Sequence, residues 1–145
     1  MPTRSARTSW TGGLQDGSGT VELTSSGAGS FDVSFPKRAA DEAGGTTSPE
    51  ELIAAAHTSC YAMALSGEIA SAGGTPQSLD VSADVTLRPD PAGGFRISGV
   101  ALTVRGTVDG LDEAGFVAAA EAAKAGCPVS KALTGTTITL DAALA

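Results

Sequence analysis

The chain has few side chains that bind transition metals. Its 145 residues include one histidine, His57, and two cysteines, Cys60 and Cys127. Zinc normally takes four ligands, at least three of them from protein. A zinc site here would need all three side chains and an added carboxylate, so we expect no metal.

Basic residues are also scarce. Nine Lys and Arg stand against sixteen Asp and Glu, and the formal net charge is -7. Nucleic-acid binding depends on Lys and Arg stripes that neutralise phosphates. We therefore expect no nucleic-acid partner, although one local arginine could still hold a small anion.

Long apolar runs are missing as well. The start, MPTRSARTSWTGG, has two arginines without an apolar stretch behind them, which predicts neither a signal peptide nor a membrane anchor. No stretch reaches the roughly 18–20 apolar residues of a membrane span. We expect a cytoplasmic protein, and two cysteines in that reducing compartment favour chemistry over a permanent disulfide.

What is present fits one compact domain. Hydrophobic residues make up 41% of the chain and charged residues 17%, as in soluble globular proteins. A length of 145 residues is close to the usual size of one domain. We expect a single domain over residues 1–145.

Two β blocks are predicted. Short runs around Trp10, Val21 to Leu23 and Phe31 to Phe35, separated by turn residues, are typical of meander strands. In the second block, residues 79–87 alternate apolar and polar, and a strand follows the PDPAGG turn. Its apolar phase slips near Gly99, which predicts a β-bulge.

Helices complete the pattern. Ser48, Pro49 and Glu51 form a helix start, and the helix should end at about Ala72. No charged residue occurs from Leu52 to Gly67, so we expect burial on nearly every face. Helices at 112–126 and from Pro128, then a strand at 136–144, complete an α+β fold whose antiparallel sheets wrap a buried central helix.

The two cysteines differ in setting. Cys60 lies in mid-helix among apolar residues, where free cysteine often serves only as a small hydrophobic side chain. Cys127 precedes Pro128 at a helix N-cap, where backbone N–H groups and the helix dipole favour a thiolate, although it could simply replace a Ser or Thr cap. His57 is three residues before Cys60, and a hydrogen-bonded core residue is a more common fate for it than catalysis.

Burial would raise the pKa of the Cys60 thiol, so an active Cys60 needs a nearby cation. Arg38 is the best candidate, because a guanidinium stays charged when desolvated and can hold a thiolate and a carboxylate together. Glu50 is the natural carboxylate, unless it only interacts with the helix dipole. Ten residues of helix separate it from Cys60, a rise of about 15 Å, so a shared site favours a dimer.

These residues resemble a known family. SPEELIAAAHTSCYAMALS, followed by GCPVSKAL, is similar to the OsmC/Ohr family of thiol-dependent peroxidases, and the ending CPVSKALTGTTITLDAAL is closer to its OsmC branch. The resemblance extends from Trp10 to the last strand.

The resemblance implies an antioxidant enzyme that reduces organic hydroperoxides, and hydrogen peroxide less well. It implies that Cys60 is the peroxidatic thiolate, Cys127 the resolving cysteine, and Arg38 with Glu50 the activating pair. It also implies an intertwined homodimer with interfacial sites, no bound cofactor, and an external dithiol reductant of lipoyl type. Arg4, Arg7 and Lys37 are the alternatives to Arg38.

Two other functions fit part of the pattern. A dimeric binding protein for an apolar ligand would leave both cysteines inert, and it would have no reason to pair Cys127 with Cys60. A structural disulfide protein is disfavoured because we expect no export signal.

Overall fold

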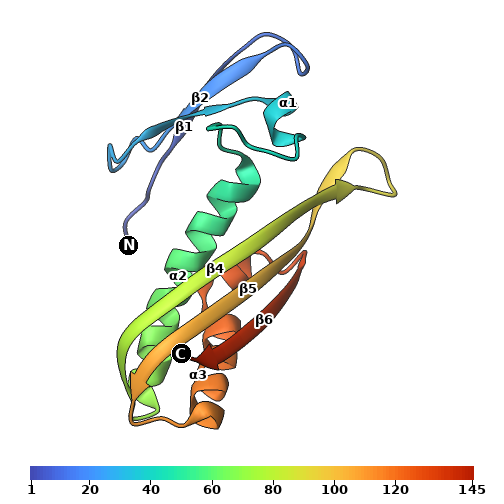
Figure 1. Cartoon of the computed structure of the whole chain (residues 1–145). Coiled ribbons are helices and arrows are strands. Elements are labelled where there is room, and N and C mark those ends of the chain that lie inside the picture. Colours follow the sequence, from blue (N-terminus) through green and yellow to red (C-terminus); the bar gives the residue numbers. More distant parts are fainter. The chain divides into compact units, whose positions relative to one another are not determined.

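The computed structural model describes residues 1–145 and divides them into two compact units, Met1–Leu52 and Ile53–Ala145 (Figure 1). Each unit has its own three-stranded sheet, and the long helix α2 (Pro49–Ser71) begins in the first unit and continues in the second. The α+β prediction is confirmed, whereas the single domain stays a prediction. No helix is both long and apolar enough to cross a membrane.

The first unit is an antiparallel meander, as predicted. Strands β1 (Arg7–Thr11), β2 (Ser18–Glu22) and β3 (Ser30–Val33) pair in chain order. The turn between β1 and β2 needs a glycine at position 12, whose φ is 92°. The strands follow the short β-prone runs and their glycine-rich turns.

A short helix, α1 (Phe35–Arg38), lies where the sequence predicted only a loop. The Ser34 side chain accepts a hydrogen bond from the Lys37 backbone N–H at 3.4 Å, and Pro36 occupies the first turn. These are ordinary signals of a helix start. Four residues are too few to show a helical period, so only the cap could have revealed this helix.

The second unit has a mixed sheet. Strands β4 (Thr75–Pro89) and β5 (Phe95–Asp109) are antiparallel, but β5 and β6 (Thr137–Leu144) are parallel. The prediction of purely antiparallel sheets is therefore wrong. Helices α3 (Glu113–Gly126) and α4 (Pro128–Ala132) carry the chain back before β6 begins, which is the crossover that parallel strands require.

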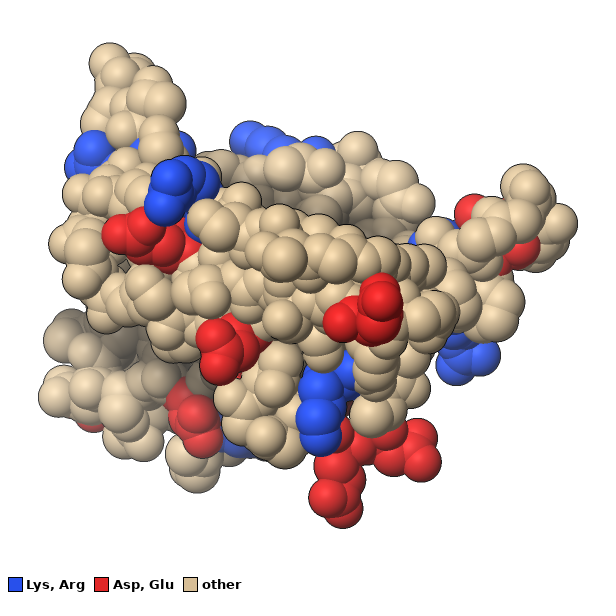
Figure 2. Space-filling model, turned by 90° about the horizontal axis from the view of Figure 1, so that it is seen from above, with Lys and Arg blue, Asp and Glu red and all other residues tan.

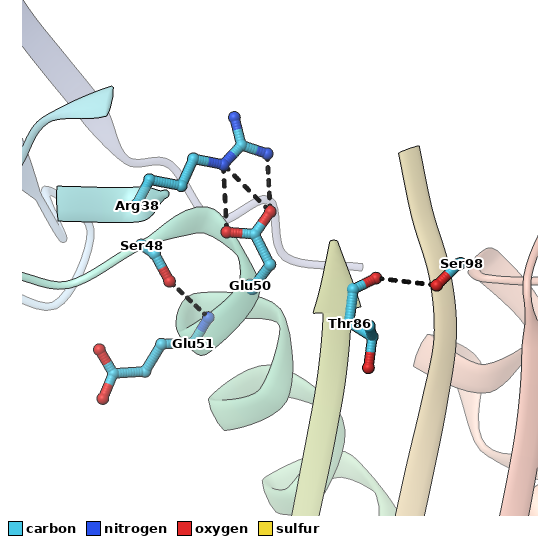
Figure 3. A network of polar contacts seen from close by, with 6 residues as sticks. All are labelled: Arg38, Ser48, Glu50, Glu51, Thr86 and Ser98. Carbon is cyan, nitrogen blue, oxygen red and sulfur yellow. Dashed lines mark hydrogen bonds and ion pairs between the residues drawn. The ribbon is translucent and has the colours of Figure 1, made fainter. Parts of the chain in front are cut away.

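The predicted β-bulge is confirmed. Thr86 pairs with Gly99 and Leu87 pairs with Ile97, so Ser98 is the extra residue in β5. The Ser98 hydroxyl donates a hydrogen bond to the Thr86 carbonyl oxygen at 3.3 Å (Figure 3). The slip in the apolar phase of the sequence arises from this residue.

The core of the second unit joins α2, α3 and β5. The buried residues that meet there are Tyr61, Leu65, Ile69, Val100, Leu102, Val104, Phe116, Ala119, Ala120, Ala123 and Cys127. Along α2, burial recurs every fourth residue, from His57 through Tyr61 and Leu65 to Ile69. One face of this helix segment therefore packs inward.

The prediction that α2 is buried on nearly every face is wrong for the single chain. Met63 is 76% exposed, and Ser59 and Gly67 are also exposed. The absence of charge from Leu52 to Gly67 therefore does not report burial within one chain. It leaves an uncharged helix face open.

Replacing Gly106 by alanine should destabilise the protein by about 1–3 kcal/mol. A Cβ at this position of β5 would lie 2.7 and 2.8 Å from ring atoms of Phe116, which is fully buried and cannot move aside. Urea unfolding measures the change. Gly99→Ala is the matched control in the same strand, because its Cβ would meet only the Thr137 carbonyl oxygen at 3.6 Å. Equal stabilities of the two variants would contradict the packing argument.

Candidate active site

The two cysteines meet in the second unit. Cys60 on α2 and Cys127 at the start of α4 are 67 residues apart in sequence, and their Sγ atoms lie 3.1 Å apart. Both are free thiols, since a disulfide would bring the sulfurs to about 2.05 Å. The two sulfurs are therefore close enough to form a disulfide after a small movement.

The two thiols differ in access. Cys127 is fully buried, whereas Cys60 is partly exposed. Cys60 is thus the more accessible residue of the pair. This difference in exposure favours Cys60 over Cys127 as the thiol that an external oxidant would meet first.

The pKa shifts of the pair run in opposite directions. Burial, and then the hydrogen bond between the two thiols, raise the pKa of the Cys60 thiol, because that bond favours Cys60 as the protonated partner. Burial also acts to raise the pKa of Cys127, but the backbone N–H of Ser130, Cys60, the Val129 N–H and the Ser130 hydroxyl outweigh it and lower that pKa. Cys60 thus lacks a cation in its own unit, which is the electrostatic problem that the sequence raised.

Cys127 is the N-cap residue of α4, as predicted, although its sulfur makes no capping hydrogen bond of standard geometry. Cys127, directly before Pro128, is also held by the end of α3, because its backbone N–H donates a hydrogen bond to the Ala123 carbonyl oxygen at 2.8 Å. One residue thus ends α3 and begins α4. This double position fixes the sulfur against α2.

His57 is fully buried, and its Nε2 lies 2.7 Å from the Ser130 hydroxyl oxygen. Burial lowers the pKa of His57, so the ring is neutral at neutral pH. The expectation of a hydrogen-bonded core histidine is met at this nitrogen. The other nitrogen, Nδ1, is buried with no hydrogen-bond partner.

The second predicted pair lies in the first unit. Arg38, at the end of α1, donates from Nε to Glu50 Oε1 and Oε2, each at 3.1 Å, and from its terminal nitrogen to Oε1 at 2.6 Å (Figure 3). This is a two-pronged ion pair of the kind that only arginine makes. The side chain of Arg38 is 30% exposed and that of Glu50 is 11% exposed.

Strand β3 brings this pair together. Helix α1 begins directly after β3, and the loop that follows returns to the same strand, where the Thr47 backbone N–H donates to the Asp32 carbonyl oxygen at 3.0 Å. Ser48 then starts α2 by accepting from the Glu51 N–H at 3.2 Å. The ends of the loop are therefore close, and Glu50 reaches Arg38 across them.

Glu50 is ionised despite its burial. Burial acts to raise the pKa of its carboxyl, but the hydrogen bond from Arg38, its own backbone N–H and the charge of Arg38 outweigh it, and the pKa lies below its usual value. An ionised Glu50 in turn holds the guanidinium of Arg38 in one orientation. The Arg38 side chain as a whole remains partly open to solvent.

Arg38 borders an apolar pocket of about 270 Å³ in the first unit. The pocket is lined by Thr8, Trp10, Leu14, Val21, Val33, Ser34, Phe35, Arg38, Thr47, Pro49 and Leu52. Such a site suits a ligand with an apolar body and a polar or anionic end. On the face drawn in Figure 2, red and blue side chains are scattered among tan residues and form no basic stripe.

Comparison with known proteins identifies the family. Residues 41–141 match the family model described as OsmC-like protein. The chain is also 44% identical over 132 residues to "Peroxiredoxin OsmC" of Escherichia coli K12, which covers 91% of this chain and 90% of that protein. The chain belongs to the OsmC family.

Solved structures agree with this OsmC assignment. A crystal structure of an organic hydroperoxide resistance protein OsmC from Legionella pneumophila has a TM-score of 0.79 at 28% identity, covering 99% of this chain and 98% of that one. The organic hydroperoxide resistance protein OhrB of Bacillus subtilis has a TM-score of 0.73 at 29% identity, covering 97% and 98%. The predicted α+β fold of the OsmC type and the peroxidase class of enzyme are confirmed.

The OsmC chain thus brings its predicted site residues together in two pairs, one in each unit. Cys60 meets Cys127, and Arg38 meets Glu50. Their catalytic roles stay predictions. Sequence reasoning missed Ser130, which contacts His57 from 73 residues away, and the signal for it was its position three residues after a helix N-cap.

Proposed function

We propose that this OsmC protein reduces organic hydroperoxides, and hydrogen peroxide less well, with Cys60 as the attacking thiolate and Cys127 as the resolving thiol. The observation that carries the proposal is the contact of the two free sulfurs at 3.1 Å, with Cys60 partly exposed and Cys127 buried. A binding protein with inert cysteines would have no use for that arrangement.

The first step would transfer one oxygen to sulfur. The Cys60 thiolate attacks the outer oxygen of the hydroperoxide, the O–O bond breaks, and an alkoxide leaves and takes a proton to become an alcohol. Cys60 becomes a sulfenic acid and is oxidised by two electrons, which reduce the peroxide. A cation beside the departing oxygen stabilises its developing negative charge.

The second step would consume the sulfenic acid. Cys127 attacks the Cys60 sulfur, the S–O bond breaks, and the oxygen leaves as water. The product is an intramolecular disulfide, so the enzyme needs no bound cofactor. An external dithiol, for which a lipoyl group is our proposal, would reopen the disulfide by thiol exchange.

We assign the cation to Arg38 of a second protomer. In its own unit Cys60 has a raised pKa, and the open uncharged face of α2, where Met63 is 76% exposed, is suited to burial against another copy. A homodimer in which Arg38 and Glu50 of one protomer face Cys60 of the other supplies the charge. The same dimer also explains how Glu50 and Cys60 can serve one site although about 15 Å of helix separates them in each chain.

The preference for organic hydroperoxides rests on the pocket beside Arg38. Its volume of about 270 Å³ and its Trp10, Leu14 and Phe35 walls suit an apolar substituent, while Arg38 would hold the peroxide oxygens. Hydrogen peroxide has no apolar group to bury there. Hydrogen peroxide would therefore gain no binding free energy from the apolar walls of the pocket, although Arg38 could still hold its oxygens.

Reduced protein mixed with equimolar cumene hydroperoxide should lose about 2 Da by intact mass, because two thiols become one disulfide. Peptide mapping should join Cys60 to Cys127. Dithiothreitol should reverse the change. The proposal is wrong if the thiols survive a hydroperoxide that has full access to folded protein, or if the disulfide joins two protomers instead.

A further inference from the structure

A buried polar chain leads from the resolving cysteine to His57. The Ser130 backbone N–H and hydroxyl both lower the pKa of the Cys127 thiol, and His57 Nε2 lies 2.7 Å from Ser130 Oγ. Ser130 is 6% exposed, and both Cys127 and His57 are fully buried. Nothing in the reaction above uses His57 or Ser130.

The second ring nitrogen of His57, Nδ1, is unusual because it is buried without a hydrogen-bond partner. A buried polar atom without a partner costs about 1–3 kcal/mol, and such atoms are rare in folded proteins. This nitrogen is buried on α2 with no partner, whichever ring nitrogen carries the hydrogen. A ring that served only to hold Ser130 would be stabilised by a partner at Nδ1.

The chain can carry hydrogens in two directions. When His57 Nε2–H donates to Ser130 and Ser130 donates to Cys127, the chain stabilises negative charge on the cysteine sulfur. When Cys127 donates to Ser130 and Ser130 donates to Nε2, the hydrogen of the neutral ring sits on Nδ1. A histidine that faces a hydroxyl at 2.7 Å is suited to both arrangements.

We propose that Ser130 and His57 form the proton path of the resolving step, in which Ser130 takes the proton from the reacting Cys127 sulfur and His57 is the positioning residue that receives the proton through it. The proposal rests on the two-cysteine reaction proposed above. It assigns these two residues to disulfide formation and not to the attack on the peroxide.

The step balances as follows. The Cys127 S–H proton moves to Ser130 Oγ while the Ser130 hydroxyl proton moves to His57 Nε2. The Cys127 sulfur then bonds to the sulfur of the Cys60 sulfenic acid, and hydroxide leaves with the S–O electron pair. Hydroxide takes a proton from solvent, and the imidazolium returns its own to solvent through Ser130, so the net products are one disulfide and one water.

Burial suits His57 to this transient duty. Because burial lowers its pKa, the ring is neutral before the step and gives the proton up quickly afterwards. The other titratable groups near the chain are Cys60 and Tyr61 on α2 and Glu121 on α3, which is paired with Lys124 at 3.0 Å. Lys124 and Lys131 border a surface pocket beside Ser130.

The test separates the two chemical steps. Reduced wild type, His57→Gln and Ser130→Ala would each be mixed with equimolar cumene hydroperoxide and quenched at intervals with dimedone, which labels sulfenic acid; intact mass then follows sulfenic acid and disulfide. Gln can hydrogen-bond to Ser130 but cannot hold a proton. Both variants should form sulfenic acid at the wild-type rate and form the disulfide at least about tenfold more slowly near pH 7.

The pH profile distinguishes a proton path from simple packing. Between about pH 6 and about pH 8, disulfide formation should rise nearly tenfold per pH unit in both variants, because the proton must then leave to solvent, and should vary much less in wild type. Ser130→Thr keeps the hydroxyl and should recover the wild-type profile.

Three results would overturn the proposal. One is wild-type disulfide formation in His57→Gln, including the case in which Ser130→Ala alone is slow, since the proton would then leave through Ser130 without the histidine. Another is slowing by the same factor at every pH, which indicates packing alone. The third is a Ser130→Thr profile that matches Ser130→Ala. Failure of the proposed function looks different, because wild type itself would then form neither sulfenic acid nor disulfide.

Discussion

Cys60→Ser protein should consume no organic hydroperoxide, whereas Cys127→Ser protein should complete one rapid turnover and then stop. Cys60 is partly exposed and is the thiol that we propose the peroxide meets, since Cys127 is fully buried. Without Cys127 the first oxidation still proceeds, but the sulfenic acid has no partner at 3.1 Å. Peroxide loss under single and multiple turnover measures both effects.

Mass spectrometry gives the control for these variants. Cys127→Ser treated with one equivalent of hydroperoxide should gain about 16 Da, and more after longer exposure as the sulfenic acid oxidises further. Cys60→Ser should keep its mass. Oxidation of Cys127 at the normal rate in the Cys60→Ser protein would reverse the assigned roles.

The lowered pKa of Cys127 makes this a sharp test. In its own unit Cys127 is the sulfur that more readily becomes a thiolate, and Cys60 has the raised pKa. Thiolate character alone would therefore select Cys127 as the attacking group. Exposure to solvent instead favours Cys60 as the attacking group. A cation from another protomer would lower the pKa of Cys60, so that exposure and thiolate character would then favour the same cysteine.

Local patterns predicted much of the fold, because their causes lie within a few residues. The slip in apolar phase near Gly99 is the bulge at Ser98, and the Ser48 start and the Asp112 start of the two long helices need only their own caps. The parallel pairing of β6 with β5 depends on where the α3–α4 crossover returns the chain, and the residue pattern of a strand does not contain that information.

The candidate site was only partly accessible to sequence reasoning. Each cysteine could be judged from its neighbours, but the contact of His57 with Ser130 joins residues 73 positions apart. The uncharged run on α2 predicts burial within the chain, whereas Met63 is 76% exposed. A helix face without charged residues indicates that the face is buried, but it does not indicate whether the same chain or a second copy covers it.

Arg38→Met should lower the rate of the first step by about 10²–10³-fold, the usual effect of losing one donor that stabilises developing charge. It should also raise the pKa of Cys60 in the dimer, because the cation that we propose offsets the effect of burial on this thiol is gone. Stopped-flow kinetics and the pH dependence of Cys60 alkylation measure the two effects. Lys37→Met, beside it on α1, is the matched control and should change neither.

Glu50 needs its own control. Removing Arg38 leaves a buried carboxylate without its ion pair, and that charge could disturb the site by itself. Arg38→Met combined with Glu50→Gln removes both charges and should be as slow as Arg38→Met. Recovery of the rate in the double variant would assign the defect to the unpaired Glu50. A Lys37→Met defect as large as that of Arg38→Met would indicate that the wrong cation was chosen.

Mixing Arg38→Met with Cys60→Ser protein should restore activity if the site is shared between protomers. Each mixed dimer would then have one site with an intact Cys60 facing an intact Arg38, and one site with neither. Random exchange at equal amounts makes half of the dimers mixed, so about a quarter of the wild-type activity should return. Subunit exchange would be verified by native mass spectrometry with one protomer isotopically labelled. If exchanged dimers stay inactive, Arg38 and Cys60 of the same chain must act together, and the open face of α2 would have another use.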